Sequence, residues 1–236
     1  MVILAGVAAV AGWRLFSSPE RAVRNKALAR REIATRVLGE EVAAQLASGQ
    51  AIILSNPFTQ KPGQAAEVYA FEQAGIAGLK KGWSDKVRLA AVVFPELSTA
   101  ALQNPETVPI DPDSKTPLSF LTAQRAWDGV LEQHQGVDVF VSLIGLPLDL
   151  QGLEVWRRPK PKIALLLPDL RMAGGLASVR DAFQRGKLLA LVLNKPGAPS
   201  EAAALDRDYR VEFERRFVLV TARNFNDMVR AYPRAF

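Results

Sequence analysis

Short apolar runs, rich in Val, Ile and Leu, alternate with helix-like segments from residue 50 to the end of the chain. These runs are nearly continuous in hydrophobicity, which is typical of strands buried on both faces of a parallel sheet. The predicted strands are 51–55, 87–94, 137–143, 163–167, 188–193 and 217–221. Strands that alternate with helices indicate βαβ units. The sequence therefore predicts an α/β fold: a three-layer, doubly wound, Rossmann-like domain over 50–236, with a mostly parallel sheet of about six strands.

Helical spacing of apolar residues fills the intervals between these strands. The predicted helices are 64–79, 119–133, 176–185, 200–215 and 224–231. A longer amphipathic helix is expected before the domain, within 17–49, because Ser18-Pro19 is a favourable helix start. Gly39 inside this helix costs about 1 kcal/mol relative to alanine, which disfavours one unbroken segment.

The first 13 residues carry no charge. This stretch is shorter than the roughly 20 residues that span a bilayer, and it resembles the apolar region of a signal peptide. We expect residues 1–16 to be an uncleaved membrane anchor. Its expected membrane-contacting residues are Val2, Ile3, Leu4, Val7 and Val10, followed by Trp13 at the interface and Arg14 at the head groups. A cleaved signal peptide, a buried core helix and a true start upstream of Met1 remain open alternatives.

The net charge of +6 is concentrated near the N-terminus. Residues 1–40 hold seven basic and three acidic side chains. A basic segment directly after an apolar one is expected to lie against anionic lipid head groups. A nucleic-acid surface would need a basic face with stacking aromatics on the folded body, so we predict no nucleic-acid partner.

The chain has no cysteine and a single histidine, His134. Disulfides, cysteine-ligated metals, thiol catalysis and multi-histidine metal sites are therefore excluded. Neither common nucleotide-phosphate loop motif occurs. We expect His134 to end a helix, where a cation interacts favourably with the helix dipole. No metal and no cofactor are predicted.

Polar residues follow the predicted strands at the edge where such folds bind ligands. The candidate ligand- or partner-binding residues are Asn56, Glu96, Asp149, Asp169, Asn194 and Lys195. The segment 98–117 is long and rich in proline, which is typical of a lid or a partner-binding element. The three carboxylates in this set could also serve acid–base catalysis if two of them met in a pocket.

Part of the chain resembles the periplasmic sugar-binding proteins and the lactose-repressor-type core. The resemblance covers about residues 120–198 and rests on 123–132, 136–141, 182–192 and 194–196, with a looser echo at 72–75. It implies a type 1 periplasmic-binding fold. The ligand motif is not kept, because Leu143-Ile144-Gly145 stands where the family has an Asn-Asp pair, although Asp169 could match the family's next Asp. Sugar binding and closure of two lobes therefore do not follow from the resemblance.

These observations favour a membrane-anchored, non-enzymatic module that contacts a partner protein or a small polar ligand, as a subunit of a membrane-associated complex. The alternative is a hydrolase or sugar-modifying enzyme that uses the strand-end carboxylates. A third possibility is a transporter component that takes its second lobe from another chain. The resemblance and the signal-like segment place the body on the extracytoplasmic, periplasmic side, whereas a literal positive-inside rule would place it in the cytoplasm.

Overall fold

The computed structural model describes residues 19–236. The expected anchor, with Val2, Ile3, Leu4, Val7, Val10, Trp13 and Arg14, lies outside the described residues. Within the part that is described, no helix combines the length and the apolar character needed to cross a bilayer.

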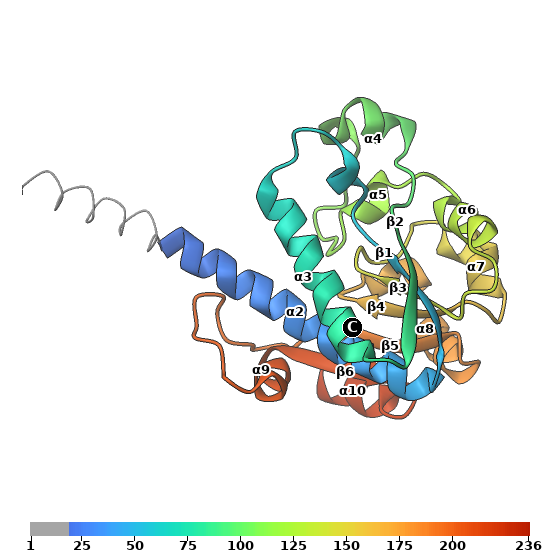
Figure 1. Ribbon diagram of the computed structural model, residues 1–236. Coiled ribbons are helices and arrows are strands. Elements are labelled where there is room, and N and C mark those ends of the chain that lie inside the picture. The colour runs from blue at the N-terminus through green and yellow to red at the C-terminus, as the bar shows by residue number, and fades with distance from the viewer. Residues whose placement is uncertain (1–18) are drawn as a thin grey trace, which may run out of the picture.

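The body is a six-stranded sheet with helices on both faces (Figure 1). Its strands are β1 (Gly49–Leu54), β2 (Val87–Val93), β3 (Val139–Ser142), β4 (Lys162–Leu166), β5 (Leu188–Asn194) and β6 (Phe217–Thr221). Their order is β2-β1-β3-β4-β5-β6, and only β6 runs antiparallel to its neighbour. The predicted α/β class and mostly parallel six-stranded sheet are thus confirmed, with each strand boundary within about two residues of its predicted place.

The helices form the two outer layers. They are α2 (Pro19–Leu46), α3 (Ala66–Trp83), α4 (Thr99–Gln103), α5 (Leu118–Leu121), α6 (Ala126–Gln133), α7 (Glu154–Arg157), α8 (Leu176–Gln184), α9 (Tyr209–Arg216) and α10 (Phe225–Ala231). One layer consists of α2, α3 and α9, and the other contains α6, α7, α8 and α10. His134 caps the C-terminal end of α6, as expected.

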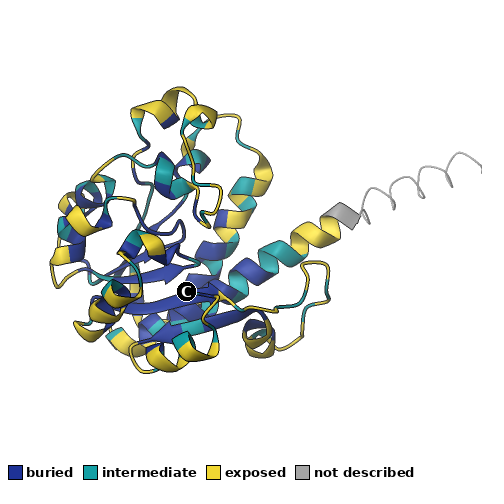
Figure 2. Ribbon diagram, turned by 180° about the vertical axis from the view of Figure 1, so that it is seen from behind, coloured by how far each residue is buried: buried dark blue, intermediate teal, exposed yellow. Residues whose placement is uncertain are grey.

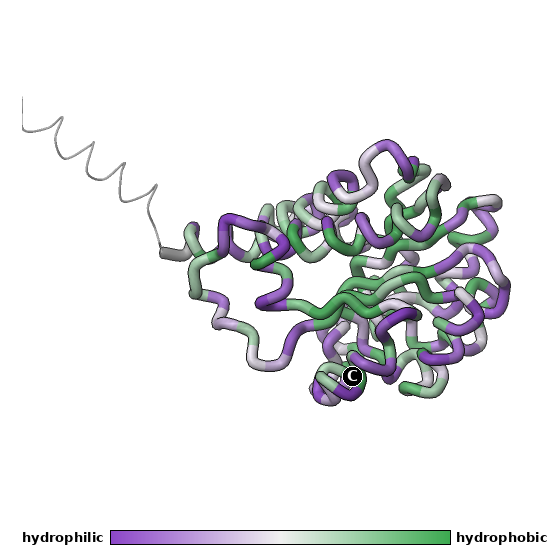
Figure 3. Tube along the Cα trace, turned by 90° about the horizontal axis from the view of Figure 1, so that it is seen from below, coloured by the Kyte–Doolittle hydropathy of each residue, from purple (hydrophilic) through white to green (hydrophobic). Residues whose placement is uncertain are grey.

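Two hydrophobic cores lie on opposite faces of the sheet because successive strand residues point in opposite directions. The strand residues facing α6, α7, α8 and α10 include Ile52, Leu54, Phe140, Leu165 and Leu191. The residues facing α2, α3 and α9 include Ile53, Val141, Ala164, Leu166 and Val192. Figures 2 and 3 show the same arrangement, with buried, hydrophobic strands at the centre and exposed, hydrophilic segments at the periphery. Burial on both faces explains why the strands read as continuous apolar runs.

Helix α2 is unbroken through Gly39 because it packs very closely on α3. A Cβ atom at Gly39 would lie 2.8 Å from the carbonyl oxygen of Leu79. On the facing side, a Cβ atom at Gly78 would overlap Thr35, and one at Gly82 would overlap the backbone of α2. Gly39 has a low helix propensity, but the close contact between α2 and α3 leaves no room for a side chain at this position.

Two predicted helices are shorter than expected. The segment 119–133 is divided into α5 and α6, because Arg125 adopts a left-handed backbone conformation with φ of +59°. In 200–215 only the second half is helical, as α9. The first half is a loop held by α2, whose Lys26 and Arg30 side chains donate to the carbonyl oxygens of Ala202 and Glu201, both at 2.6 Å.

Candidate functional site

The six candidate residues lie on segments that follow the carboxyl ends of the strands, as predicted from the alternation of strands and helices. Asn194 is the last residue of β5, and Lys195 follows it. Asn56 follows β1, Asp169 follows β4, and Glu96 and Asp149 lie on the longer connections after β2 and β3. Each of these residues has its own set of contacts, which are described in turn below.

The crevice between β1 and β3, where the strand order reverses, is filled by a buried ion pair. Arg31 Nη2 of α2 lies 2.9 Å from Glu72 Oε1 of α3, and both side chains are 8% exposed. Ser55 at the end of β1 donates from Oγ to Glu72 Oε2 at 2.7 Å. Doubly wound folds commonly bind ligands at this reversal. Here the protein's own side chains occupy that position.

Asn56 has a local structural role beside this ion pair. Its Oδ1 accepts a hydrogen bond from the backbone N–H of Phe58 at 2.9 Å and so caps a short turn of 3-10 helix at Pro57–Gln60. Its own backbone N–H approaches Glu72 Oε2 at 3.4 Å. The side-chain amide oxygen of Asn56 is therefore already engaged by the fold.

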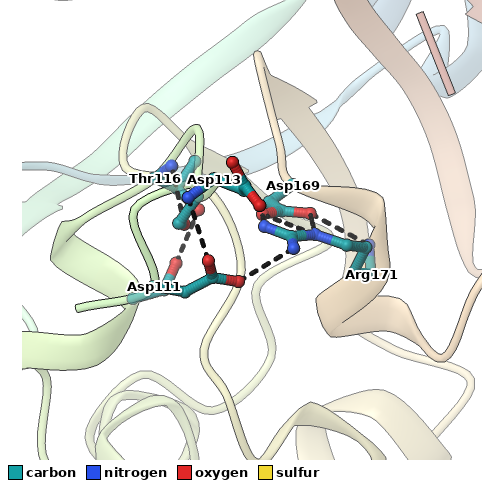
Figure 4. Close-up of polar contacts among 7 residues, drawn as sticks. Asp111, Asp113, Thr116, Asp169 and Arg171 are labelled. Carbon is teal, nitrogen blue, oxygen red and sulfur yellow. Dashed lines mark hydrogen bonds and ion pairs between the residues drawn. The ribbon is translucent and has the colours of Figure 1, made fainter. Parts of the chain in front are cut away.

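Asp169 ties the long segment 98–117 to the end of β4 (Figure 4). Its carboxylate is buried and receives Arg171 Nε at 3.0 Å on Oδ1 and Arg171 Nη2 at 2.6 Å on Oδ2. The other arm of Arg171 donates to Asp111 at 2.8 Å. The Arg171 hydrogen bond is the main reason that the pKa of Asp169 lies below its usual range, and a backbone N–H of Lys115 contributes. We call this set of contacts the Asp169 clasp.

The segment 98–117 also packs directly on the end of β3. Thr116 is buried, and a Cβ atom at Gly145 would lie 2.5 Å from Thr116 Cγ2. Gly145 also has φ of +83°, a conformation that favours glycine. The loop that follows β3 can therefore accept Thr116 only because it carries glycine at this position.

The three candidate carboxylates have separate surroundings. Asp149 accepts the backbone N–H of Arg125 at 2.9 Å, Asp169 belongs to the clasp, and Glu96 is exposed. No hydrogen bond within residues 19–236 joins any two of these three side chains. Asp149 and Asp169 each make a structural contact with a different part of the chain.

A cavity of about 270 Å³ opens at the carboxyl ends of β4 and β5. It is lined by Lys115, Leu167, Pro168, Leu193, Asn194, Lys195, Pro196, Arg234 and Ala235. Two of the predicted residues, Asn194 and Lys195, thus lie together at this cavity. Asn56, Glu96, Asp149 and Asp169 are not among its lining residues, although Asp169 anchors the segment that supplies Lys115.

The cavity wall is held by backbone contacts at the strand ends. Lys195 donates from its backbone to Arg216 O at 2.8 Å and from Nζ to Glu214 O at 2.7 Å. Leu167 has a left-handed φ of +46° while its N–H bonds Val192 O at 2.8 Å. A left-handed conformation at a residue other than glycine, asparagine or aspartate costs roughly 1–3 kcal/mol and persists only where the surrounding structure enforces it.

Sequence reasoning missed two residues of the cavity, Lys115 and Arg234. Lys115 lies in the proline-rich segment 98–117, and Arg234 lies in the turn after α10. Neither residue comes shortly after a predicted strand, which is the pattern that identifies the other candidates.

No family model matches the chain, and no curated protein sequence matches it. Solved structures with a similar fold include solute-binding proteins of sugar ABC transporters. The sugar-binding protein of a sugar ABC transporter from Bacillus halodurans is 12% identical, with a TM-score of 0.45 over 84% of this chain and 64% of that one. A carbohydrate transporter solute binding protein from Agrobacterium radiobacter, in complex with D-arabinose, is 14% identical, with a TM-score of 0.45 over 86% and 63%.

A periplasmic solute binding protein of an ABC transporter from Actinobacillus succinogenes, with bound D-allose, is 8% identical, with a TM-score of 0.41 over 84% of this chain and 60% of that one. The chain thus spans less than two thirds of the length of these three proteins. They are of the class that the sequence resemblance named. Similarity of this size concerns the arrangement of strands and helices and says nothing about what this chain binds.

Proposed function

We propose that this protein is a non-enzymatic binding module that takes a small polar ligand in the cavity at the ends of β4 and β5. The convergence of Asn194, Lys195 and Arg234 on one cavity at the carboxyl edge carries the proposal. An amide and cationic groups on an otherwise apolar wall are typical of a small-ligand site, in which a few polar groups fix orientation. At about 270 Å³ the cavity suits a ligand smaller than a drug-sized molecule.

The surroundings of the carboxylates favour binding over the hydrolase alternative. Asp169 is neutralised by Arg171, and Asp149 holds the backbone of Arg125. A general acid–base pair needs two groups within reach of one substrate bond. These two carboxylates hold loops in position.

We further propose that residues 1–16 anchor the protein in a membrane, with the body on the extracytoplasmic side and a protein partner in a larger assembly. The uncharged stretch 1–13, followed by Arg14, supports the anchor. The sequence resemblance to periplasmic sugar-binding proteins supports the extracytoplasmic side. Helix α2 leads from that segment into the body, where it packs on α3 and on the loop 200–208 (Figure 1).

Thermal unfolding of the full chain in non-ionic detergent tests the binding site. A ligand at about 100 times its Kd stabilises a folded protein by about 2.7 kcal/mol. We expect at least one compound in a panel of sugars, amino acids, nucleotides and small organic anions to raise Tm. Asn194→Trp should abolish that increase by filling the cavity, whereas Gln103→Trp, on an exposed residue of α4, should preserve it. A panel that leaves Tm unchanged would contradict the binding function.

Cell fractionation tests the anchor and its orientation. Deletion of residues 1–16 should move the protein from the membrane fraction to the soluble fraction. External protease should degrade the body in intact spheroplasts. A truncated protein that stays in the membrane fraction would reject the anchor, and a protected body would place it in the cytoplasm.

A further inference from the structure

Three basic residues from distant parts of the sequence line the cavity at the ends of β4 and β5. Lys115 comes from the segment 98–117, Lys195 follows β5, and Arg234 comes from the C-terminal turn. None of the residues that line this cavity in the described structure is acidic. Lys115 and Arg234 are exposed, and Lys195 is half-buried.

Lys115 is held at the cavity by the Asp169 clasp. Its backbone N–H bonds the Asp169 carboxylate, and the next residue, Thr116, is buried against Gly145. The clasp uses the charges of Asp169 and Asp111 on Arg171, at 2.6 and 2.8 Å. The nearby carboxylates of the clasp therefore do not pair with Lys115.

Lys195 and Arg234 are also held in place by neighbouring structure. The Lys195 ammonium group donates to the carbonyl oxygen of Glu214 at 2.7 Å, which satisfies one of its three hydrogens. The backbone of Arg234 is fixed by the residues after it. Ala235 is buried and donates to Tyr232 O at 2.9 Å, and the ring of Phe236 packs edge-on against Phe225 with centroids 5.8 Å apart.

No carboxylate among the described residues of the cavity wall offsets the positive charges that line it. Neither the Lys115 nor the Arg234 side chain has a hydrogen-bond or ion-pair partner among residues 19–236. Like charges that share one cavity repel, and the repulsion is larger at a partly desolvated protein surface than in bulk water. The Lys195 ammonium also lies 5.8 Å from the centroid of the Tyr232 ring. Its remaining hydrogens and the Arg234 guanidinium can be satisfied by solvent or by a bound anion.

We propose that the cavity binds a small organic molecule with two or more negative charges on phosphate or carboxylate groups. This inference rests on the proposed binding function and names its ligand class. The planar guanidinium of Arg234 matches a carboxylate or phosphate with two parallel hydrogen bonds, and the lysines add two compact charges. The apolar wall of Leu167, Pro168 and Leu193 suits the carbon skeleton of such a molecule.

Isothermal titration calorimetry on the full chain in non-ionic detergent tests this assignment. The probes are pyrophosphate, citrate and glucose, which present phosphate, carboxylate and no charge. We expect pyrophosphate, citrate or both to bind, with weaker affinity as NaCl rises from about 50 to about 300 mM. Glucose should not bind.

The variants Lys115→Gln, Lys195→Gln and Arg234→Gln should each weaken anion binding roughly tenfold, because each removes a charge-assisted contact. Lys86→Gln is the matched control. It removes the same charge from an exposed residue just before the edge strand β2, which β1 and β3 separate from β4, and should leave binding unchanged.

The outcomes separate the ligand class from the binding function. Binding of pyrophosphate but not citrate would identify phosphate as the anionic group of the ligand. Binding of citrate but not pyrophosphate would identify carboxylate. Glucose binding that Asn194→Trp abolishes, without anion binding, would overturn the anionic class and retain the binding function. Anion binding that Lys86→Gln weakens as much as the cavity variants would overturn the site. Failure of all three probes would overturn the class, and a failed thermal panel would reject the binding function itself.

Discussion

Several charged side chains are buried in this fold, among them Arg31, Glu72 and Lys187. Lys187 is 2% exposed and lies next to β5. Its ammonium group donates to the carbonyl oxygens of Arg158, at 2.9 Å, and Pro161. Burial is the main cause that lowers the pKa of Lys187 to about 8, and repulsion from Arg185 adds to it.

The lowered pKa of Lys187 predicts that stability depends on pH. The folded protein loses this proton at about pH 8, whereas the unfolded chain keeps it up to about 10.5, so the unfolded state binds more protons in this interval. The contribution of Lys187 to the free energy of unfolding should therefore rise as pH increases from about 8 to about 10. Urea unfolding of the wild type and Lys187→Met measures it, with Lys86→Met as an exposed control. A difference between wild type and Lys187→Met that is constant with pH contradicts the prediction.

The Arg31–Glu72 ion pair predicts a large effect of a small substitution. Glu72→Gln leaves the Arg31 guanidinium buried without a counter-charge, and breaking such a pair costs about 3–5 kcal/mol of stability. Glu67→Gln, one and a half turns earlier on α3, breaks an exposed pair with Arg24 and should cost less than about 1 kcal/mol. Chemical denaturation compares the two variants. Equal losses would show that Glu72 does not stabilise the fold through Arg31.

At the scale of elements, the contact between α2 and α3 is set by small residues. A methyl group at Gly78 would overlap Thr35 and the backbone oxygen of Glu32. Gly78→Ala should therefore separate the helices and destabilise the protein by about 1–3 kcal/mol. Gly129→Ala, in α6, meets no atom within 4 Å and should stabilise by about 0.5–1 kcal/mol through helix propensity. Opposite shifts in Tm are expected, and stabilisation by both substitutions would disprove close helix packing.

The elements that sequence reasoning predicted well are those whose pattern depends on burial alone. The strands are continuous apolar runs because two helical layers cover them, and this pattern is visible in one dimension. The break between α5 and α6 is not visible, because Arg125 takes its left-handed conformation while its N–H bonds the distant Asp149. Similarly, the loop 200–208 is held by Lys26 and Arg30 of α2, a contact that helical periodicity cannot reveal.

At the scale of the whole molecule, only part of the cavity lining could be predicted from the sequence, because the rest depends on contacts between distant segments. Asn194 and Lys195 follow a strand and could be found from topology. Lys115 reaches the cavity through the Asp169 clasp, and Arg234 reaches it through the packing of the C-terminal turn. The carboxyl edge thus differs along its length. The Arg31–Glu72 pair fills it at β1 and β3, and a cavity lies at β4 and β5.

Hydrogen–deuterium exchange of the full chain, with and without pyrophosphate, shows where the anion binds. We expect slower exchange of backbone amides in 193–198 and 114–116 when the anion is bound, because these segments line the cavity. Amides of 55–60 and 143–147, at the reversal of strand order, should exchange at unchanged rates. Protection confined to those two latter segments would place the ligand at the reversal between β1 and β3 and contradict the account.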